Sequence, residues 1–173
     1  QYGGSTREAA AKSYSPIHCT GNDGTKLAAG TRISSATNPT TYLSSTDTRE
    51  ISRTSFNRAC IKIASLGTES VYTVAINGAV FSYSPTAADT LTVLKGIAAA
   101  ITDEKFTASV DETNEFLNIE AADIASNNVL ILSENLTTET VTSIITFGTE
   151  ENGDILIPGG VITNIVNADA GLL

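Results

Sequence analysis

The chain contains no methionine and no tryptophan in its 173 residues, and it begins at Gln1. A natural chain normally starts with methionine, and the last residues, 171–173, give no sign of a natural end. We therefore expect a piece cut from a longer protein at both ends.

Basic residues are also scarce. Ten Lys and Arg stand against nineteen Asp and Glu, which gives a net charge of −9. The basic residues are scattered, whereas binding to phosphates needs them clustered, so we expect no nucleic-acid partner. The same charge disfavours an anionic membrane surface. No apolar run approaches the roughly 20 residues of a spanning helix, and no signal peptide is recognisable, so we expect no membrane partner.

Side chains that carry chemistry are few. His18 is the single histidine, and it adjoins Cys19. Adjacent residues of a strand point to opposite faces, so the two make a poor nucleophile–base couple. A tetrahedral zinc site would need carboxylates in addition, which the pattern disfavours. We expect Cys19 and Cys60 to be reduced, buried thiols. A disulfide stays open, because sequence does not show whether their Cα atoms lie within about 7 Å.

Carboxylates are plentiful but dispersed. The densest group, residues 150–154 (EENGD), could bind Ca²⁺ through oxygens, yet it lacks the spacing of an EF-hand loop and is typical of a solvated turn. The same holds for the pairs at 103–104 and 111–112. The glycine pairs at 3–4 and 159–160 lack the helix and lysine of a phosphate loop. We predict no catalytic, cofactor-binding or metal-binding residue, no cofactor, and no enzyme.

What the chain does have is a composition that favours strands. Apolar residues make up 41% and charged residues 17%, and Thr, Ser, Ala, Ile and Val are abundant. The clearest local pattern is a hairpin of residues 71–76 and 79–83 around Asn77-Gly78, a dipeptide that favours a type I′ turn. A two-residue turn predicts these facing pairs on one side of the hairpin: Tyr72 with Tyr83, Val74 with Phe81, and Ile76 with Ala79. Thr73 and Ser82 then face each other on the other side.

A helix is predicted to follow the hairpin, with Thr86 as its N-cap and Asp89 three residues on. Its apolar residues recur at helical spacing: Leu91, Leu94, Ile97, Ala98 and Ile101. Three further strands are predicted at residues 106–110, 117–121 and 129–132.

Sparser strands flank this centre. They are predicted at residues 17–20, 31–35, 40–43, 60–64, 141–147, 155–157 and 161–166, and Pro16 is expected to end the first element. The predicted fold class is therefore α+β. We expect a discontinuous β-rich host domain of residues 1–66 and 141–173, with a domain inserted at residues 67–140. The inserted domain would be an antiparallel sheet plus one helix, in the order β-β-α-β-β-β.

Two stretches at the ends of the chain share a pattern with a known family. Residues 6–11 (TREAAA) hold an arginine followed by small residues, residues 17–25 (IHCTGNDGT) a strand ending in Thr-Gly, and residues 27–33 (LAAGTRI) an Ala-Gly-Thr motif. The second stretch is residues 152–172 (NGDILIPGGVITNIVNADAGL). Taken in this order, they resemble the baseplate J-like wedge proteins of contractile phage tails and related injection machines.

The resemblance implies a virion structural protein of the tail baseplate, assembled in the bacterial host cytoplasm. It implies other baseplate, sheath or hub subunits as partners, around a hub of six-fold symmetry, and a possible oligomer in the assembled tail. Such proteins mediate protein–protein assembly without catalysis. The segment at about 68–140 departs from the shorter members of the family, so the resemblance does not explain it.

Two other function classes compete. A strand-rich, acidic chain could be a surface adhesin or carbohydrate-binding module, which would use exposed aromatic platforms or a Ca²⁺ site. We instead expect Tyr72, Phe81 and Tyr83 to pack as one hairpin face on the helix. A hydrolase is the third option, and it would require turnover that is lost on His18→Ala.

Overall fold

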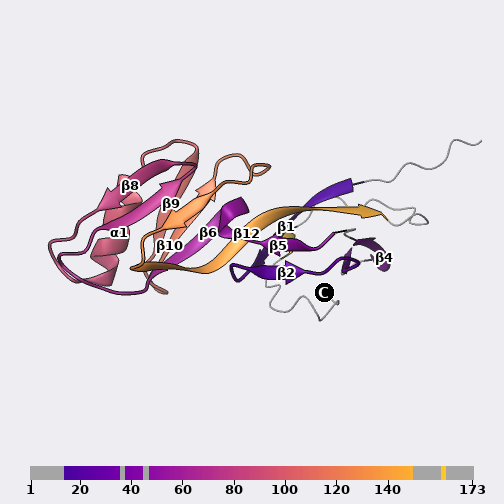
Figure 1. Cartoon of the computed structure of the whole chain (residues 1–173), viewed down its shortest axis with the longest axis horizontal. Helices are drawn as coiled ribbons and strands as arrows, with labels where there is room; N and C mark the ends of the chain where they lie inside the picture. The colour runs from indigo at the N-terminus through magenta and orange to yellow at the C-terminus, as the bar shows by residue number, and fades with distance from the viewer. Residues whose placement is uncertain (1–13, 36–37, 45–46, 150–160, 163–173) are drawn as a thin grey trace, which may run out of the picture.

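The computed structural model describes residues 14–35, 38–44, 47–149 and 161–162, and these form a β-rich fold with one α-helix (Figure 1). The strands of the first half are β1 (Tyr14–Gly21), β2 (Thr25–Leu27), β3 (Arg32–Ser35), β4 (Asn38–Ser44), β5 (Arg49–Ile51), β6 (Phe56–Ile63), β7 (Tyr72–Ile76) and β8 (Ala79–Tyr83). Those of the second half are β9 (Phe106–Asp111), β10 (Phe116–Ala121), β11 (Leu130–Leu132), β12 (Leu136–Thr149) and β13 (Val161–Ile162). The helix is α1 (Thr90–Ala100), and a 3-10 turn, η1, covers Arg53–Ser55. The α+β class is confirmed at this level.

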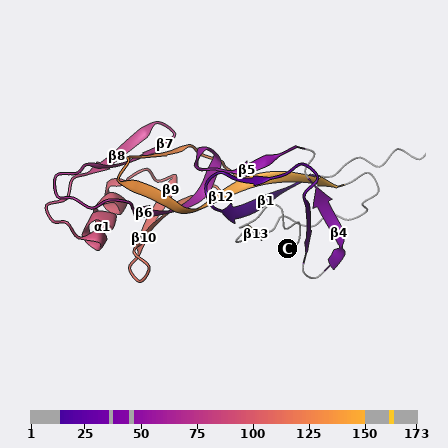
Figure 2. The ribbon, with the colours of Figure 1, turned by 60° about the horizontal axis from the view of Figure 1, so that its bottom comes forward.

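Strand β12 is the spine of the larger sheet. This sheet has the order β13-β1-β12-β6-β10-β9, and the β3–β4 pair attaches to it through β12. Fourteen residues of extended chain span about 45 Å. Figures 1 and 2 show β12 running from the helix-bearing end toward the end that holds β1, β2, β4 and β5. The molecule is therefore elongated, and this one strand links its two ends.

A second sheet of three strands, in the order β11-β7-β8, lies at the helix-bearing end. Helix α1 contacts β7 and β8 of this sheet and β9 and β10 of the larger one, so it bridges the two. Tyr72 is fully buried here. Its hydroxyl donates to Ser65 O at 3.1 Å and accepts from Gly67 N at 3.0 Å, which satisfies the polar end of a large core side chain.

The predicted hairpin is confirmed as β7–β8. Each predicted pair appears in the register, including Tyr72 with Tyr83. Asn77 and Gly78 have φ values of 51° and 86°, as a type I′ turn requires. The hydroxyls of Thr73 and Ser82 lie 3.1 Å apart on the opposite face.

The predicted start of the helix is wrong by three residues. Asp89, not Thr86, is the N-cap. Its carboxylate accepts from Thr92 N at 2.8 Å and from Thr92 Oγ1 at 2.6 Å. A charged acceptor is favoured at the positive end of a helix, so Asp89 is the stronger cap. The helix buries Val93, Leu94 and Ile97, of which Val93 was not predicted.

The strands of the central segment do not form one sheet. Along the chain they follow the order β7, β8, α1, β9, β10, β11, but β9 and β10 belong to the larger sheet because β10 pairs with β6. Leu117 of β10 lies opposite Ile61 of β6, and both are fully buried. This long-range pairing buries the apolar face of β10, and it divides the segment between two sheets.

The outer strands agree with most of the predicted stretches. Residues 17–20, 40–43 and 141–147 lie within β1, β4 and β12, and β6 and β12 both begin earlier than predicted. The expected end of the first element at Pro16 is wrong, because β1 continues through it. Strand β13 pairs only with His18 and Cys19, so Pro16 lies where one side of β1 has no described neighbour, and proline is tolerated there. The predicted strand at 155–157 lies outside the described residues, as do residues 1–13.

Candidate functional site

The two groups nearest to a nucleophile–base pair, His18 and Cys19, lie side by side on β1 but differ in burial. Cys19 is fully buried, whereas His18 is half-buried. The Cys19 Sγ lies 3.8 Å from the Ile17 carbonyl oxygen, and burial raises the pKa of the thiol to about 12. A thiol with this pKa is almost wholly protonated at neutral pH, so Cys19 is a core side chain and a poor nucleophile.

Cys19 and Cys60 are both free. Strand β12 separates them, because it pairs with β1 on one side and with β6 on the other. Cys19 aligns with Ser143 of β12, and Cys60 aligns with Thr140. Two strand spacings and a three-residue offset place the two cysteines more than about 10 Å apart, beyond the reach of a disulfide. Cys60 is only half-buried, so the expectation of two buried thiols is wrong for this residue.

The acidic pairs singled out in the sequence lie at chain reversals. Asp111 Oδ1 accepts from Thr113 N at 3.0 Å and from Asn114 N at 3.1 Å, and Oδ2 accepts from the Asn114 side chain at 2.8 Å. These bonds, chiefly those from Asn114, lower the pKa of Asp111. Glu112 pairs with Lys95 of α1 at 2.7 Å. No group of three or more His, Cys, Asp and Glu among the described residues could hold a metal ion. Residues 150–154 lie outside this part of the chain.

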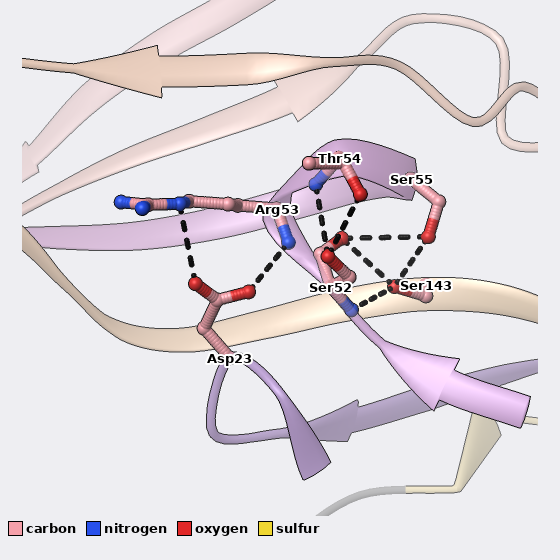
Figure 3. A network of polar contacts seen from close by, with 6 residues as sticks. All are labelled: Asp23, Ser52, Arg53, Thr54, Ser55 and Ser143. Atoms are coloured by element: carbon pink, nitrogen blue, oxygen red, sulfur yellow. Dashed lines mark hydrogen bonds and ion pairs between the residues drawn. The ribbon is translucent and has the colours of Figure 1, made fainter. Parts of the chain in front are cut away.

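A polar junction, shown in Figure 3, fastens η1 to β12 and to the turn after β1. Ser143 is 1% exposed. Its Oγ accepts from Ser52 N at 3.0 Å and donates to Ser52 O at 3.2 Å, and Ser55 Oγ lies 3.4 Å away. Asp23 accepts from Arg53 N at 2.8 Å and pairs with Arg53 Nε at 3.2 Å. The carboxylate of Asp23 bonds to Arg53, and the serine hydroxyls bond to one another and to the backbone, so the bonds of this junction hold η1, β12 and the turn after β1 together.

The sequence carries one sign of this junction. Positions 141, 145 and 147 of β12 are buried apolar residues, and Ser143 occupies the buried position between them. A hydroxyl in a buried row of apolar residues needs a partner. The backbone of Ser52 supplies it, and the pairing crosses 91 residues of sequence.

Asparagine side chains hold the segment before β11 in the same manner. Asn127 donates to Ile144 O at 3.0 Å and accepts from Ile144 N at 3.1 Å. Asn77 accepts from Val129 N at 2.9 Å and donates to Asn128 Oδ1 at 2.8 Å. The Asn127 amide therefore takes the place of a neighbouring strand for Ile144, and the Asn77 amide links the β7–β8 turn to the segment before β11.

An open depression of about 260 Å³ lies where the end of β6 approaches α1 and the β9–β10 turn. Its lining includes Ser65, Leu66, Thr90 and Glu115. The residues that line it include one charged side chain, Glu115. A ligand site usually combines apolar walls with several convergent polar groups, so this depression does not suggest a ligand.

The surface that stands out is the outward face of the three-stranded sheet, where the apolar residues Val71, Ala75, Val80, Val129 and Ile131 lie beside the polar pair Thr73 and Ser82. Val80 is 65% exposed and Ile131 is 60% exposed. Both lie opposite Ala75 in the register, so the three form one row across the sheet. The opposite face carries Tyr72, Phe81 and Tyr83, which pack on the core as predicted.

No helix in the described part of the chain is long and apolar enough to cross a membrane. No protein-family model matches the chain, and no curated protein is significantly similar to it. The resemblance to baseplate J-like proteins therefore stays a prediction.

Proposed function

We propose that this chain is a structural component of a phage or prophage tail baseplate wedge, acting through protein–protein assembly and not through catalysis. The observation that carries the proposal is how its polar side chains are used. The side chains of Ser143, Asn127 and Asn77 hydrogen-bond to the backbone of residues that lie 91, 17 and 52 positions away in the sequence. Bonds of this kind fix distant parts of the chain relative to one another, which suits a subunit that holds its neighbours in place. The chain would act in the virion, with other baseplate, sheath or hub subunits as its partners.

We also propose that the centre of the chain is an insertion in a β-rich host domain. Ile63, the last residue of β6, lies opposite Leu136, the first residue of β12. Ala64 N donates to Asn135 O at 2.8 Å, so the segment leaves and returns at one place. A short turn between β6 and β12 could replace it, and insertions are tolerated at such points. This geometry favours limits near 64 and 135, close to the predicted 67 and 140.

Open strand edges support the assembly role. Strand β9 is an outer strand of the larger sheet, and β8 is an outer strand of the smaller one. Unpaired backbone groups at an edge can pair with a strand of another chain. In a wedge, such edges would join this chain to neighbouring subunits.

The test is to purify tail particles from the bacterium that produces this protein and to identify their components by mass spectrometry. We expect the chain in stoichiometric amount, with antibodies against it labelling the baseplate end of the tail in electron micrographs. Deleting its gene should leave tails without complete baseplates. Purified particles that lack the chain would refute the proposal.

The main alternative, an adhesin or carbohydrate-binding module, predicts a different result. It requires saturable binding on a glycan array or in a Ca²⁺ titration of the purified chain. The packing of Tyr72, Phe81 and Tyr83 against the core removes them as an exposed aromatic platform, which is why we place assembly first.

A further inference from the structure

One row of the outward face of the three-stranded sheet is apolar and exposed, beside the polar pair Thr73 and Ser82 of the same face. Ile131, Ala75 and Val80 form this row, and Val71, at the edge of the face, is 55% exposed. The exposure of these side chains shows that no described element covers them. Exposed apolar patches on a sheet mark interaction sites or aggregation-prone surfaces. What surrounds the face decides between these two.

The segment of the chain that carries this face is strongly acidic. Residues 67–140 contain eleven acidic and two basic residues, whereas the rest of the chain contains eight of each. The entire net charge of −9 therefore belongs to the central segment. Of its two lysines, Lys95 pairs with Glu112, and the other, Lys105, follows the helix. No Lys or Arg occurs between residues 63 and 94 or after residue 105.

Two glutamates flank the Val71 side of the face. Glu69 is exposed and lies two residues before Val71. Glu134, also exposed, lies between Ser133, whose N donates to Thr73 O, and Asn135, whose side chain donates to Val71 O at 3.1 Å. An apolar centre with a charged rim is the usual anatomy of a protein–protein interface.

We propose that this face docks a basic protein surface, an apolar patch ringed by Lys and Arg. A second copy of the chain would bring two segments of charge −9 together, and like charges facing each other oppose such contact. Anionic lipids and nucleic acids are opposed by the same charge. A partner with clustered Lys and Arg around an apolar patch satisfies both the centre and the rim.

The area of the face indicates how much of the contact the apolar row can supply and how much must come from charged residues. Two strands of five residues and one of three, spaced about 4.8 Å apart, cover roughly 200 Å². A standard interface buries about 800 Å² on each partner. The apolar row can therefore be only the centre of the contact. Most of the interface must lie outside this row, on the rest of the acidic central segment, so binding should depend strongly on salt.

The inference rests on the assembly role proposed above and specifies the surface through which it acts. The test uses the full chain produced in its own bacterium, with the photoreactive residue p-benzoyl-phenylalanine placed at Val80 or at Ile131. A third version carries it at Ile124, which is 67% exposed but lies in no strand. We expect illumination to join positions 80 and 131 to the same protein, through a segment of net positive charge, and position 124 not to join it.

The chemistry of the contact is then tested on the purified pair. We expect Val80→Lys to raise the Kd at least about tenfold and Val80→Asp to raise it less, because the aspartate keeps the favourable charge. Ile124→Lys should change the Kd less than about threefold, and about 0.5 M salt should weaken binding about tenfold relative to 0.1 M. Unchanged circular dichroism spectra would show that the variants fold.

The inference is overturned by cross-links only between copies of this chain, by no cross-link at either sheet position, or by a Val80→Lys variant that binds as tightly as Val80→Asp. These outcomes are independent of whether the chain is found in purified tail particles. A chain that is in the particle but binds through another surface refutes this inference and leaves the assembly role intact. A basic partner found for a chain that is absent from particles refutes the assembly role and leaves this inference intact.

Discussion

The substitution Gly96→Ala in α1 should destabilise the protein when the ring of Tyr83 is present and stabilise it when that ring is removed. Gly96 lies under the ring of Tyr83, and a Cβ built at Gly96 would come within 3.0 Å of three carbons of that ring. Ordinary carbon–carbon contacts are about 3.5–4.0 Å, so the ring would have to withdraw by about 1 Å or more. Glycine is thus required at this position by packing, although it is a poor helix former.

The magnitude follows from two opposing effects of Gly96→Ala. Alanine favours the helix over glycine by about 1 kcal/mol, while forced repacking costs about 1–3 kcal/mol. We expect a net loss of up to about 2 kcal/mol in the free energy of unfolding. In a Tyr83→Ala background the repacking cost disappears, so the same substitution should stabilise the protein by about 1 kcal/mol. The double-mutant cycle should give a coupling of about 1–3 kcal/mol.

Urea denaturation followed by circular dichroism measures all four proteins, and Ala99→Gly on the exposed side of the same helix calibrates the propensity. If Gly96→Ala stabilises the protein while Tyr83 is present, or if its effect is the same in both backgrounds, the packing of the ring on the helix is wrong.

Three further predictions concern single side chains. Ser143→Ala should lower the free energy of unfolding by about 1–3 kcal/mol, because it leaves Ser52 N without its buried acceptor. The control Ser109→Ala, at an exposed position of β9, should lower it by less than about 0.5 kcal/mol. Equal losses in urea denaturation would contradict the role of the junction. Hydrogen bonds from Thr92 lower the pKa of Asp89 below 3.8, so the stability that Asp89 adds over Asp89→Asn is present above pH 3.8 and is lost as pH falls through the folded pKa. The urea midpoints of the two proteins should therefore approach each other as the pH falls below 3.8, and a constant difference would argue against the cap. Burial, followed by the nearby charge of Glu139, raises the pKa of Cys60 to about 11, so its alkylation at pH 8 should be about a hundredfold slower than that of an unperturbed cysteine; a rate equal to that of a free thiol would contradict this environment.

Local signals in the sequence predicted local structure well. The β7–β8 register follows from Asn77-Gly78 and the alternation on either side, since the turn and the two strands are decided within thirteen residues. The start of α1 was misplaced because Thr86 and Asp89 are both good caps, and which one is used depends on where Pro85 and the helix pack. Thr86 is left outside the helix.

Long-range pairing was beyond the sequence pattern. Residues of β10 carry the same alternation whether they pair within the central segment or with β6, so the pattern could not show that two sheets form. The contacts of Asn127 and Asn77 also join residues far apart, and at these positions the sequence shows only polar residues typical of loops. The acidic bias of residues 67–140, in contrast, can be counted directly from the sequence, and charge asymmetry of this kind indicates an interaction region.

The continuous strand β12 also determines how the protein would carry a load. It is paired with β1 over residues 141–148 and with β6 over residues 136–143, so the two pairings overlap in the middle of the strand. Hydrogen bonds in an antiparallel pair lie perpendicular to the strands. A pull along the long axis would therefore strain many of these bonds at once in shear, instead of opening them one after another. The long direction of this molecule is thus its stiff direction, and tension applied at one end would reach the other through a single unbroken length of backbone.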